Sequence, residues 1–378
     1  MTRLGDLLEL VQEPAPDDDP LVGLQDLVPG QLRVEQVGDR EPASDPARAR
    51  RFRRGDLLFG ALRPEQDKLA LADVDGACSP EILVLRPRAP GSGAAGLALA
   101  ALAHPFTRAR ARQLTRGTRM PRVRWRDLAR VAPPLPPPAD HQALGEVVAL
   151  LTARLDVLHA RDRADADLLR AALTAERSTA PGRVACGPRL GDVATRRGEA
   201  LPRGSSPDDV PTLGLADLPG NGLAIHAPPH SPGSGSLVPF ARGDLLLPLL
   251  RPGSGKVGIA PFDGVASAEI LALELDPLWR VAVAAWLLLP STAAALAFRA
   301  TGTRMPRVPR EAALDLRLPL CEDGARRLSA LAPLVDRALH APDHARALHA
   351  LRDTVICHGL PPRWSERVSR AVSVQEAP

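Results

Sequence analysis

Residues 55–83 read GDLLFGALRPEQDKLALADVDGACSPEIL, and residues 243–271 read GDLLLPLLRPGSGKVGIAPFDGVASAEIL. The two stretches are identical at 15 of 29 positions without a gap, at an offset of 188 residues. A second stretch, GTRMPRV, occurs at 117–123 and returns intact at 302–308. Repeats of solenoid proteins have much shorter periods, about 20–50 residues. The sequence therefore predicts a tandem duplication of a whole domain.

Both copies contain the same types of segment in the same order. Short runs typical of β-strands alternate with turns rich in Gly, Pro and Asp, and alanine-rich stretches typical of helices follow. The GTRMPRV loop and a proline-rich exit come next. This order predicts two α+β domains of about 140 residues each. The expected strands are 55–60, 81–85, 243–250 and 269–275, and the expected helical stretches are 94–113 and 278–300.

A long helix is expected between the copies, over residues 140–177. Its apolar positions follow a spacing of four and three residues, which is typical of helices that pair in coiled coils. At a rise of about 1.5 Å per residue the helix extends about 57 Å. Asp162 and Asp165 interrupt the apolar seam. The seam consists of Leu144, Val148, Leu151, Leu155, Leu158, Asp162, Asp165, Leu169 and Ala172.

A comparable stretch with the pattern of a helix follows the second copy, at 322–358. Pro333 and Pro342 are expected to break this stretch into pieces, because proline lacks the backbone N–H that a helix interior needs. Two helices that each follow an α+β domain are expected to pack on one another.

The composition excludes several classes of protein. The 378 residues include 46 Arg but only two Lys, and 45% of them are hydrophobic, which argues against general disorder. Four widely spaced cysteines form no zinc-ribbon motif and no disulfide framework. The N-terminus lacks the apolar core of a signal peptide. The uncharged run 281–298 is interrupted by Pro290, so we expect two buried helices rather than a membrane span. A cytoplasmic protein without membrane contact is expected.

The rare residues occur at matched positions. Lys68 and Lys256 are the only lysines and are equivalent in the two copies. Met120 and Met305, the only methionines after the first residue, are equivalent as well. The simplest interpretation of the methionines is packing in the core. The lysines have either a specific role or a shared ancestry, since arginine replaces lysine almost everywhere else in this chain.

The motifs of common enzymes are missing from the sequence. The segment 253–256 reads GSGK like part of a phosphate loop, but the required first glycine and the Ser/Thr after the lysine are absent. Its repeat partner, 65–68, contains no glycine. His340 and His344 are four residues apart without the glutamate of a metalloprotease motif. We therefore expect no catalytic residue, no bound cofactor and no metal site in this chain.

The charge is unevenly distributed along the chain. Residues 1–47 carry a net charge of −8, and residues 48–138 carry +11. Nine arginines lie within 108–130, against one aspartate. Such a cluster is typical of a surface that binds a phosphate backbone. A solvated basic face remains the alternative interpretation. The equivalent stretch 295–317 is less basic, with five arginines and two acids.

The order of these motifs resembles the specificity subunit of type I restriction–modification systems. The resemblance lies in G-D-L-L, then Arg, Lys, Ser and an apolar strand, then G-x-x-M-P-x-V and a proline-rich exit into a long helix, all present twice. It implies an α+β fold with two duplicated target recognition domains, separated by long helices that pack as an antiparallel, coiled-coil-like spacer. The implied boundaries are 1–138 and 179–320 for the recognition domains, 139–178 and 321–360 for the helical regions, and 361–378 for a tail.

The resemblance also implies a function. The chain is expected to be a non-catalytic subunit that binds a bipartite target in double-stranded DNA and directs partner methyltransferase and nuclease subunits. S-adenosylmethionine, ATP and Mg²⁺ are expected on those partners. The expected DNA-binding residues are Arg63, Lys68, Arg116, Arg119, Arg122, Arg124, Arg251, Lys256, Arg304 and Arg307.

Two alternatives remain open at the level of the sequence. The chain could target DNA within a different methylation-based defence system that lacks the nuclease. It could also be a protein scaffold that uses only its helices, with recognition domains that no longer bind DNA.

Overall fold

The computed structural model describes most of the chain and divides into two compact units. The first unit contains Met1–Asp156 and Leu348–Pro378, and the second contains Val157–Ala347. The boundary falls inside two long helices, α5 (His141–Ser178) and α11 (Ala332–His358), so each unit includes a segment of both. The described residues are 1–15, 21–28, 30–34, 49–117, 119–178, 187–198, 210–226, 235–303 and 305–360.

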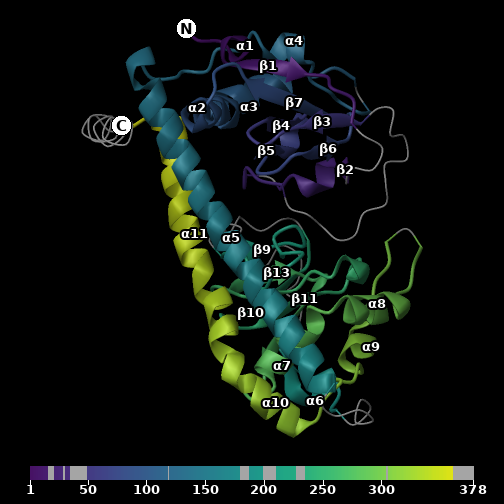
Figure 1. Cartoon of the computed structure of the whole chain (residues 1–378). Helices are drawn as coiled ribbons and strands as arrows, with labels where there is room; N and C mark the ends of the chain where they lie inside the picture. The colour runs from purple at the N-terminus through teal and green to yellow at the C-terminus, as the bar shows by residue number, and fades with distance from the viewer. Residues whose placement is uncertain are drawn as a thin grey trace. The chain divides into compact units, whose positions relative to one another are not determined.

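The first unit combines two small sheets with helices (Figure 1). Its other elements are α1 (Leu4–Leu7), β1 (Leu8–Val11), β2 (Leu21–Val22), the 3₁₀ helix η1 (Leu24–Asp26), β3 (Arg50–Phe52), β4 (Leu57–Gly60), η3 (Pro64–Gln66), β5 (Leu69–Leu71), β6 (Gly76–Cys78), β7 (Ile82–Pro87), α2 (Ser92–Ala103), α3 (Pro105–Gln113), α4 (Trp125–Leu128) and η4 (Pro138–Asp140). The strand order is β1-β7-β4-β5 in the larger sheet and β2-β6-β3 in the smaller.

The second unit repeats this order of elements. They are α6 (Leu190–Val193), β8 (Ala194–Arg196), β9 (Thr212–Leu213), β10 (Leu237–Phe240), β11 (Leu245–Pro248), η5 (Pro252–Ser254), β12 (Gly258–Ile259), β13 (Gly264–Ser267), β14 (Ile270–Leu275), α7 (Arg280–Leu287), α8 (Pro290–Phe298), α9 (Arg310–Leu314), α10 (Glu322–Leu328) and η6 (Ser329–Leu331). Its sheets have the orders β8-β14-β11-β12 and β9-β13-β10, the same as in the first unit. The mixed α and β content that the sequence predicts is confirmed.

The larger sheet of each unit is covered on both faces. In β4, Leu57 and Phe59 pack in a cluster with the helices, whereas Leu58 packs in a separate cluster with the smaller sheet. In β11, Leu245 and Leu246 divide between two clusters in the same way. Successive side chains of a strand point to opposite faces. Burial on both faces explains why these strands read as continuous apolar runs rather than alternating ones.

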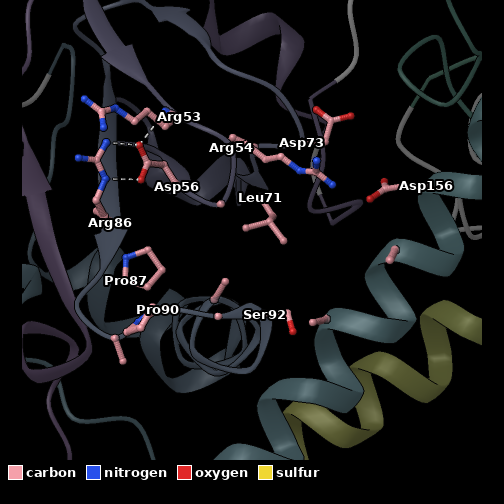
Figure 2. A pocket seen from close by; sticks show the side chains of 17 residues that line it. Arg53, Arg54, Asp56, Leu71, Asp73, Arg86, Pro87, Pro90, Ser92 and Asp156 are labelled. Atoms are coloured by element: carbon pink, nitrogen blue, oxygen red, sulfur yellow. Dashed lines mark hydrogen bonds and ion pairs between the residues drawn. The ribbon is translucent and has the colours of Figure 1, made fainter. Parts of the chain in front are cut away.

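The repeated Gly-Asp turn joins the two sheets of each unit through a buried carboxylate. Asp56 is 2% exposed and accepts a hydrogen bond of 2.8 Å from the backbone N–H of Arg53, just after β3. The guanidinium of Arg86 on β7 donates to both of its oxygens at 2.8 Å (Figure 2). In the second unit Asp244 has the same backbone cap, but Arg197, next to β8, supplies the guanidinium at 3.0 Å.

The two apolar stretches after the sheets each fold as a pair of helices. Pro105 begins α3 and Pro290 begins α8, because proline is tolerated in the first turn of a helix but not in its interior. Helices α7 and α8 meet at a bend of 76°. The expectation of two helices within 281–298 is therefore confirmed. Within the described ranges, no single helix is long and apolar enough to cross a membrane.

The helix expected between the copies is present as α5, which begins and ends within one residue of the expected bounds. The predicted seam lies on its buried side, where Leu144, Val148, Leu155 and Leu169 are all at most 1% exposed. In the first unit Leu144 and Val148 share a cluster with Val355 of α11. The start of α5 thus packs against the end of α11 within this unit.

The two aspartates that interrupt the seam make specific polar contacts in the second unit. Asp165 accepts two hydrogen bonds from Arg337 of α11, at 2.6 and 2.8 Å. Asp162 accepts from the backbone N–H of Ala224 at 3.2 Å and so holds the loop that follows β9. In the first unit the buried Arg352 of α11 holds the loop after η1, donating to the carbonyl of Gly30 at 2.7 Å.

The expectation that Pro342 breaks the C-terminal stretch is wrong. Helix α11 continues through Pro342 to His358. Pro333 lies in the first turn of α11, where proline is tolerated, and η6 separates α11 from α10, so the expected break near Pro333 is present. An interior proline costs roughly 3 kcal/mol. The neighbouring turns are well packed, with Val335, Ala338 and Ala345 each at most 4% exposed, and this burial offsets the lost hydrogen bond.

Helices α2 and α5 cross in the first unit at van der Waals contact of their backbones. A Cβ atom added to Gly145 would lie 1.9 Å from the carbonyl oxygen of Gly93, and one added to Gly96 would lie 1.9 Å from the carbonyl oxygen of Gly145. Only glycine permits so close an approach. This crossing fixes the start of α5 on the first unit.

We predict that Gly145→Ala lowers the free energy of unfolding of the first unit by about 1–3 kcal/mol, the usual cost of overpacking. Without the clash, alanine in a helix would instead be stabilising by about 1 kcal/mol. The control is Gly235→Ala, because a Cβ there meets nothing within 4 Å. Thermal unfolding followed by circular dichroism measures both, and equal or higher stability of Gly145→Ala would contradict the close crossing.

Candidate nucleic-acid interface

The GTRMPRV loop of the first unit is a closed hairpin. The backbones of Arg116 and Arg122 exchange two hydrogen bonds, of 2.9 and 3.0 Å. The hairpin is attached to the end of β4, because the N–H of Arg63 donates to the carbonyl of Pro121 at 2.8 Å and the N–H of Val123 donates to Ala61 at 3.0 Å. The loop is therefore held on the edge of the larger sheet by main-chain contacts.

The second unit forms the same hairpin. Thr301 and Arg307 exchange backbone hydrogen bonds of 2.8 and 2.9 Å, and the N–H of Arg251 donates to the carbonyl of Pro306 at 2.8 Å. Gly117 has a φ of 94° and Gly302 a φ of 91°, a region that favours glycine. Both glycines therefore permit the tight turn of the hairpin.

Arg63 and Arg251 stand in a strained backbone conformation beside the hairpins. Their φ angles are 51° and 52°, in the left-handed region. A residue other than glycine costs of order 1–3 kcal/mol there. Both side chains are exposed, and neither makes an ion pair within the described part of the chain. An exposed arginine retained in both units at a position suited to glycine indicates a role for its side chain.

Within each unit, most of the predicted DNA-binding residues lie in or beside the hairpin. They differ in whether an acidic side chain pairs with them. Arg119 and Arg124 are exposed and unpaired among the described residues. Arg116 lies 3.7 Å from Asp127, a loose pair at the surface. Arg304 lies outside the described residues. The role of these arginines in binding DNA stays a prediction.

The two lysines hold a turn. The Lys68 ammonium donates to the carbonyl of Leu24 at 2.6 Å, and the Lys256 ammonium donates to that of Leu215 at 3.2 Å. Burial lowers the pKa of Lys68, and nearby Asp26 acts in the opposite direction. A compact ammonium suits this carbonyl better than a planar guanidinium, which explains the retention of lysine. Any DNA contact by these lysines is a prediction beyond this structural role.

The turn whose carbonyls accept hydrogen bonds from the lysines is itself repeated in the sequence, which was not recognised above. It reads GLQDL at 23–27 and GLADL at 214–218. Asp26 and Asp217 cap it by accepting from the N–H of the first glycine, at 2.7 and 2.6 Å. The signal was available in the sequence, at an offset of 191 residues.

The repeated Ser-x-Glu-Ile-Leu segment makes a second contact that was not predicted from the sequence. Glu81 lies 3.6 Å from Arg122, and Glu269 pairs with Arg307. The glutamates thus hold the second arginine of each hairpin against the sheet. This contact leaves Arg119 as the arginine of the first hairpin with no acidic partner among the described residues.

The interpretation that the matched methionines pack in the core is wrong. Met120 is 48% exposed and Met305 is 58% exposed. Each lies in the loop of its hairpin, between the two residues whose backbones exchange hydrogen bonds. The sequence alone did not distinguish an apolar residue on a loop tip from one in the core.

A cavity of about 640 Å³ lies beside the Gly-Asp turn of the first unit (Figure 2). Its charged lining residues are Arg53, Arg54, Asp56, Asp73, Arg86 and Asp156. Positive and negative groups are equal in number there, and Arg86 is already bound to Asp56. The cavity therefore offers no net charge for an anionic or cationic ligand. The described residues contain no cluster of three or more potential metal ligands.

No protein-family model and no curated protein matches this chain. Among solved structures, the HsdS subunit from Thermoanaerobacter tengcongensis is 20% identical with a TM-score of 0.34, covering 95% of this chain and 96% of that one. A chain from a study of complex assembly and conformational transition of the type I R-M system is 19% identical with a TM-score of 0.35, covering 95% and 97%. The S subunit of the type I restriction-modification system from M. genitalium is 14% identical with a TM-score of 0.47, covering 95% of each chain.

All three neighbours come from type I restriction–modification systems. At these identities and TM-scores the similarity does not decide the function of this chain.

We predict that Arg63→Gly leaves the free energy of unfolding unchanged or raises it by up to about 1 kcal/mol. Glycine relieves the strain of the left-handed backbone conformation. The same change is expected to weaken DNA binding. Chemical denaturation measures the first effect, and a binding titration measures the second. Arg88→Gln serves as control, since Arg88 is an exposed arginine whose side chain contacts Glu9 and Gly5 instead. A loss of stability in Arg63→Gly would show that the arginine is structural.

Proposed function

We propose that this chain is the DNA-specificity subunit of a type I restriction–modification complex. Its recognition domains, 1–138 and 179–320, each read one half of a bipartite target in double-stranded DNA. The chain itself carries out no bond chemistry and binds no cofactor. Partner methyltransferase subunits supply S-adenosylmethionine, and a motor–nuclease subunit with ATP and Mg²⁺ joins for cleavage.

One observation carries the proposal: each unit presents the same arginine-bearing hairpin, fixed by main-chain hydrogen bonds, next to a strained and exposed arginine. Arginine binds phosphates and reads guanine in the major groove through two parallel hydrogen bonds. Reading bases requires side chains that are positioned before binding, and a hairpin bonded to a sheet provides this positioning. Two copies of such an element fit a target with two halves.

The charge of one stretch of the first unit supports a phosphate partner. Residues 48–138, which include the hairpin, carry a net charge of +11, whereas residues 1–47 carry −8. Phosphate contacts supply affinity and register, and contacts to base edges supply sequence choice. In this proposal Arg63 and Arg119 act in the first half-site and Arg251 acts in the second. Binding should be strongly dependent on salt because it releases counterions.

The long helices provide the spacer and the docking surface for partners in this proposal. Helix α5 has 38 residues, which corresponds to about 57 Å. Leu150, Val157 and Leu168 on this helix are 69%, 55% and 56% exposed. Spacings of seven and eleven residues bring side chains close to one direction around a helix. An exposed apolar stripe of this kind is typical of an interface with another protein.

The decisive experiment is sequencing of DNA methylation in cells with and without this gene. We expect deletion to abolish methylation at one bipartite motif and leave other motifs unchanged. The wild-type gene should restore it, whereas Arg63→Gly combined with Arg119→Gln should restore it only in part. The Arg88→Gln gene is the matched control and should restore it fully. A methylome that does not depend on the gene would contradict the proposal.

If deletion abolishes methylation at a motif that is not bipartite, and no nuclease acts at that motif, the result favours a different methylation-based system. Failure of the purified complex to bind DNA at low salt would favour a scaffold. These two outcomes separate the alternatives left open by the sequence.

A further inference from the structure

The exposed methionines of the two hairpins have no role in the proposed function described above. Methionine is a large apolar side chain, and burial of such a side chain is worth about 1.5–3 kcal/mol. Exposure of Met120 and Met305 at equivalent positions, by 48% and 58%, forgoes this stabilisation in both units. Single exposed apolar residues are common, but two at one position of a repeated loop require a shared explanation.

The hairpins hold these methionines in a defined place. A Cβ atom on Gly117 would lie 3.4 Å from the carbonyl oxygen of Met120, and one on Gly302 would lie 3.3 Å from that of Met305. The glycine and the methionine of each hairpin thus lie close together. Each methionine is followed by a proline with a fixed φ, whose carbonyl accepts the hydrogen bond from the strained arginine. The backbone that follows each methionine is therefore restrained.

Positive charge surrounds the first tip. Arg119 precedes Met120 directly and is exposed and unpaired among the described residues. The side chain of Arg63 is also exposed, and its backbone N–H donates to the carbonyl of Pro121, the residue that follows Met120. An apolar tip between arginines is poorly suited to a hydrophobic protein partner, because docking there would desolvate the guanidinium groups. It is well suited to DNA, where phosphates meet the arginines and the tip reaches the stacked bases.

We infer that Met120 and Met305 are wedges that insert between adjacent base pairs, one in each half-site. This inference rests on the proposed function and adds the mode of recognition. Apolar side chains such as methionine, inserted at a base step, unstack it at a cost of a few kcal/mol and kink the duplex. Flexible steps such as TA and CA are the least costly to unstack. The wedges thereby contribute to sequence choice without hydrogen bonds to the bases.

The test uses the complex of the full chain with its methyltransferase subunits and a duplex with the methylated motif. 2-Aminopurine, whose fluorescence rises when it is unstacked, is placed at successive steps of one half-site in a first set of duplexes and of the other half-site in a second set, away from the base that is modified. We expect Met120→Ala to abolish the rise in one half-site and Met305→Ala to abolish it in the other. Specific affinity should fall about tenfold or more, within the range of losing one specific contact. Met120→Leu, which keeps an apolar wedge, should retain most of the signal.

The controls separate this inference from the proposed function. Because both methionines are exposed, the variants should unfold at the wild-type temperature and retain salt-dependent binding to unrelated DNA. If the wild-type complex binds the motif but Met120→Ala and Met305→Ala leave affinity and fluorescence unchanged, the wedge is wrong and the proposed function stands. If the wild-type complex binds no DNA, the proposed function fails and the wedge fails with it.

Discussion

A buried carboxylate is the constraint on which each unit depends. Asp56 and Asp244, both 2% exposed, cap the turn between the smaller and the larger sheet and accept two hydrogen bonds from one arginine. A buried charge without its partner costs several kcal/mol, so the carboxylate and the guanidinium must stay together. The arginine lies on β7 in the first unit and directly after β8 in the second, so the same bidentate contact is made by arginines from different places in the two units.

The position of the two hairpins follows from this constraint. The Gly-Asp turn sets the start of β4 or β11, and the end of the same strand receives the hairpin through backbone hydrogen bonds at Arg63 or Arg251. The lysine and the repeated glutamate add further contacts to the same edge. The arginines proposed to contact DNA thus lie on hairpins that are bonded to a sheet, and such anchoring suits the proposed reading of base edges.

Much of the fold could be predicted from the sequence because the repeat separates structural residues from variable ones. The strands around Gly55 and Gly243, the helix α5 and the break before Pro290 all follow from local patterns. The break before Pro105, within the helical stretch expected at 94–113, was not predicted. Pro342 was misjudged, because the packing that offsets an interior proline comes from residues far away in the sequence. The exposure of Met120 was also missed, since a rare apolar residue reads as core until its turn is seen. Charged contacts such as Arg352 with the carbonyl of Gly30 carry no local signal.

In the proposed function, two equivalent units of one chain each bind one half of a DNA target. Hydroxyl-radical footprinting of the purified complex on its methylated motif shows which parts of the DNA backbone the two units cover. We expect two separate protected segments, one at each half of the motif, with unprotected backbone between them. A single protected segment, or protection that does not depend on the motif, would contradict it.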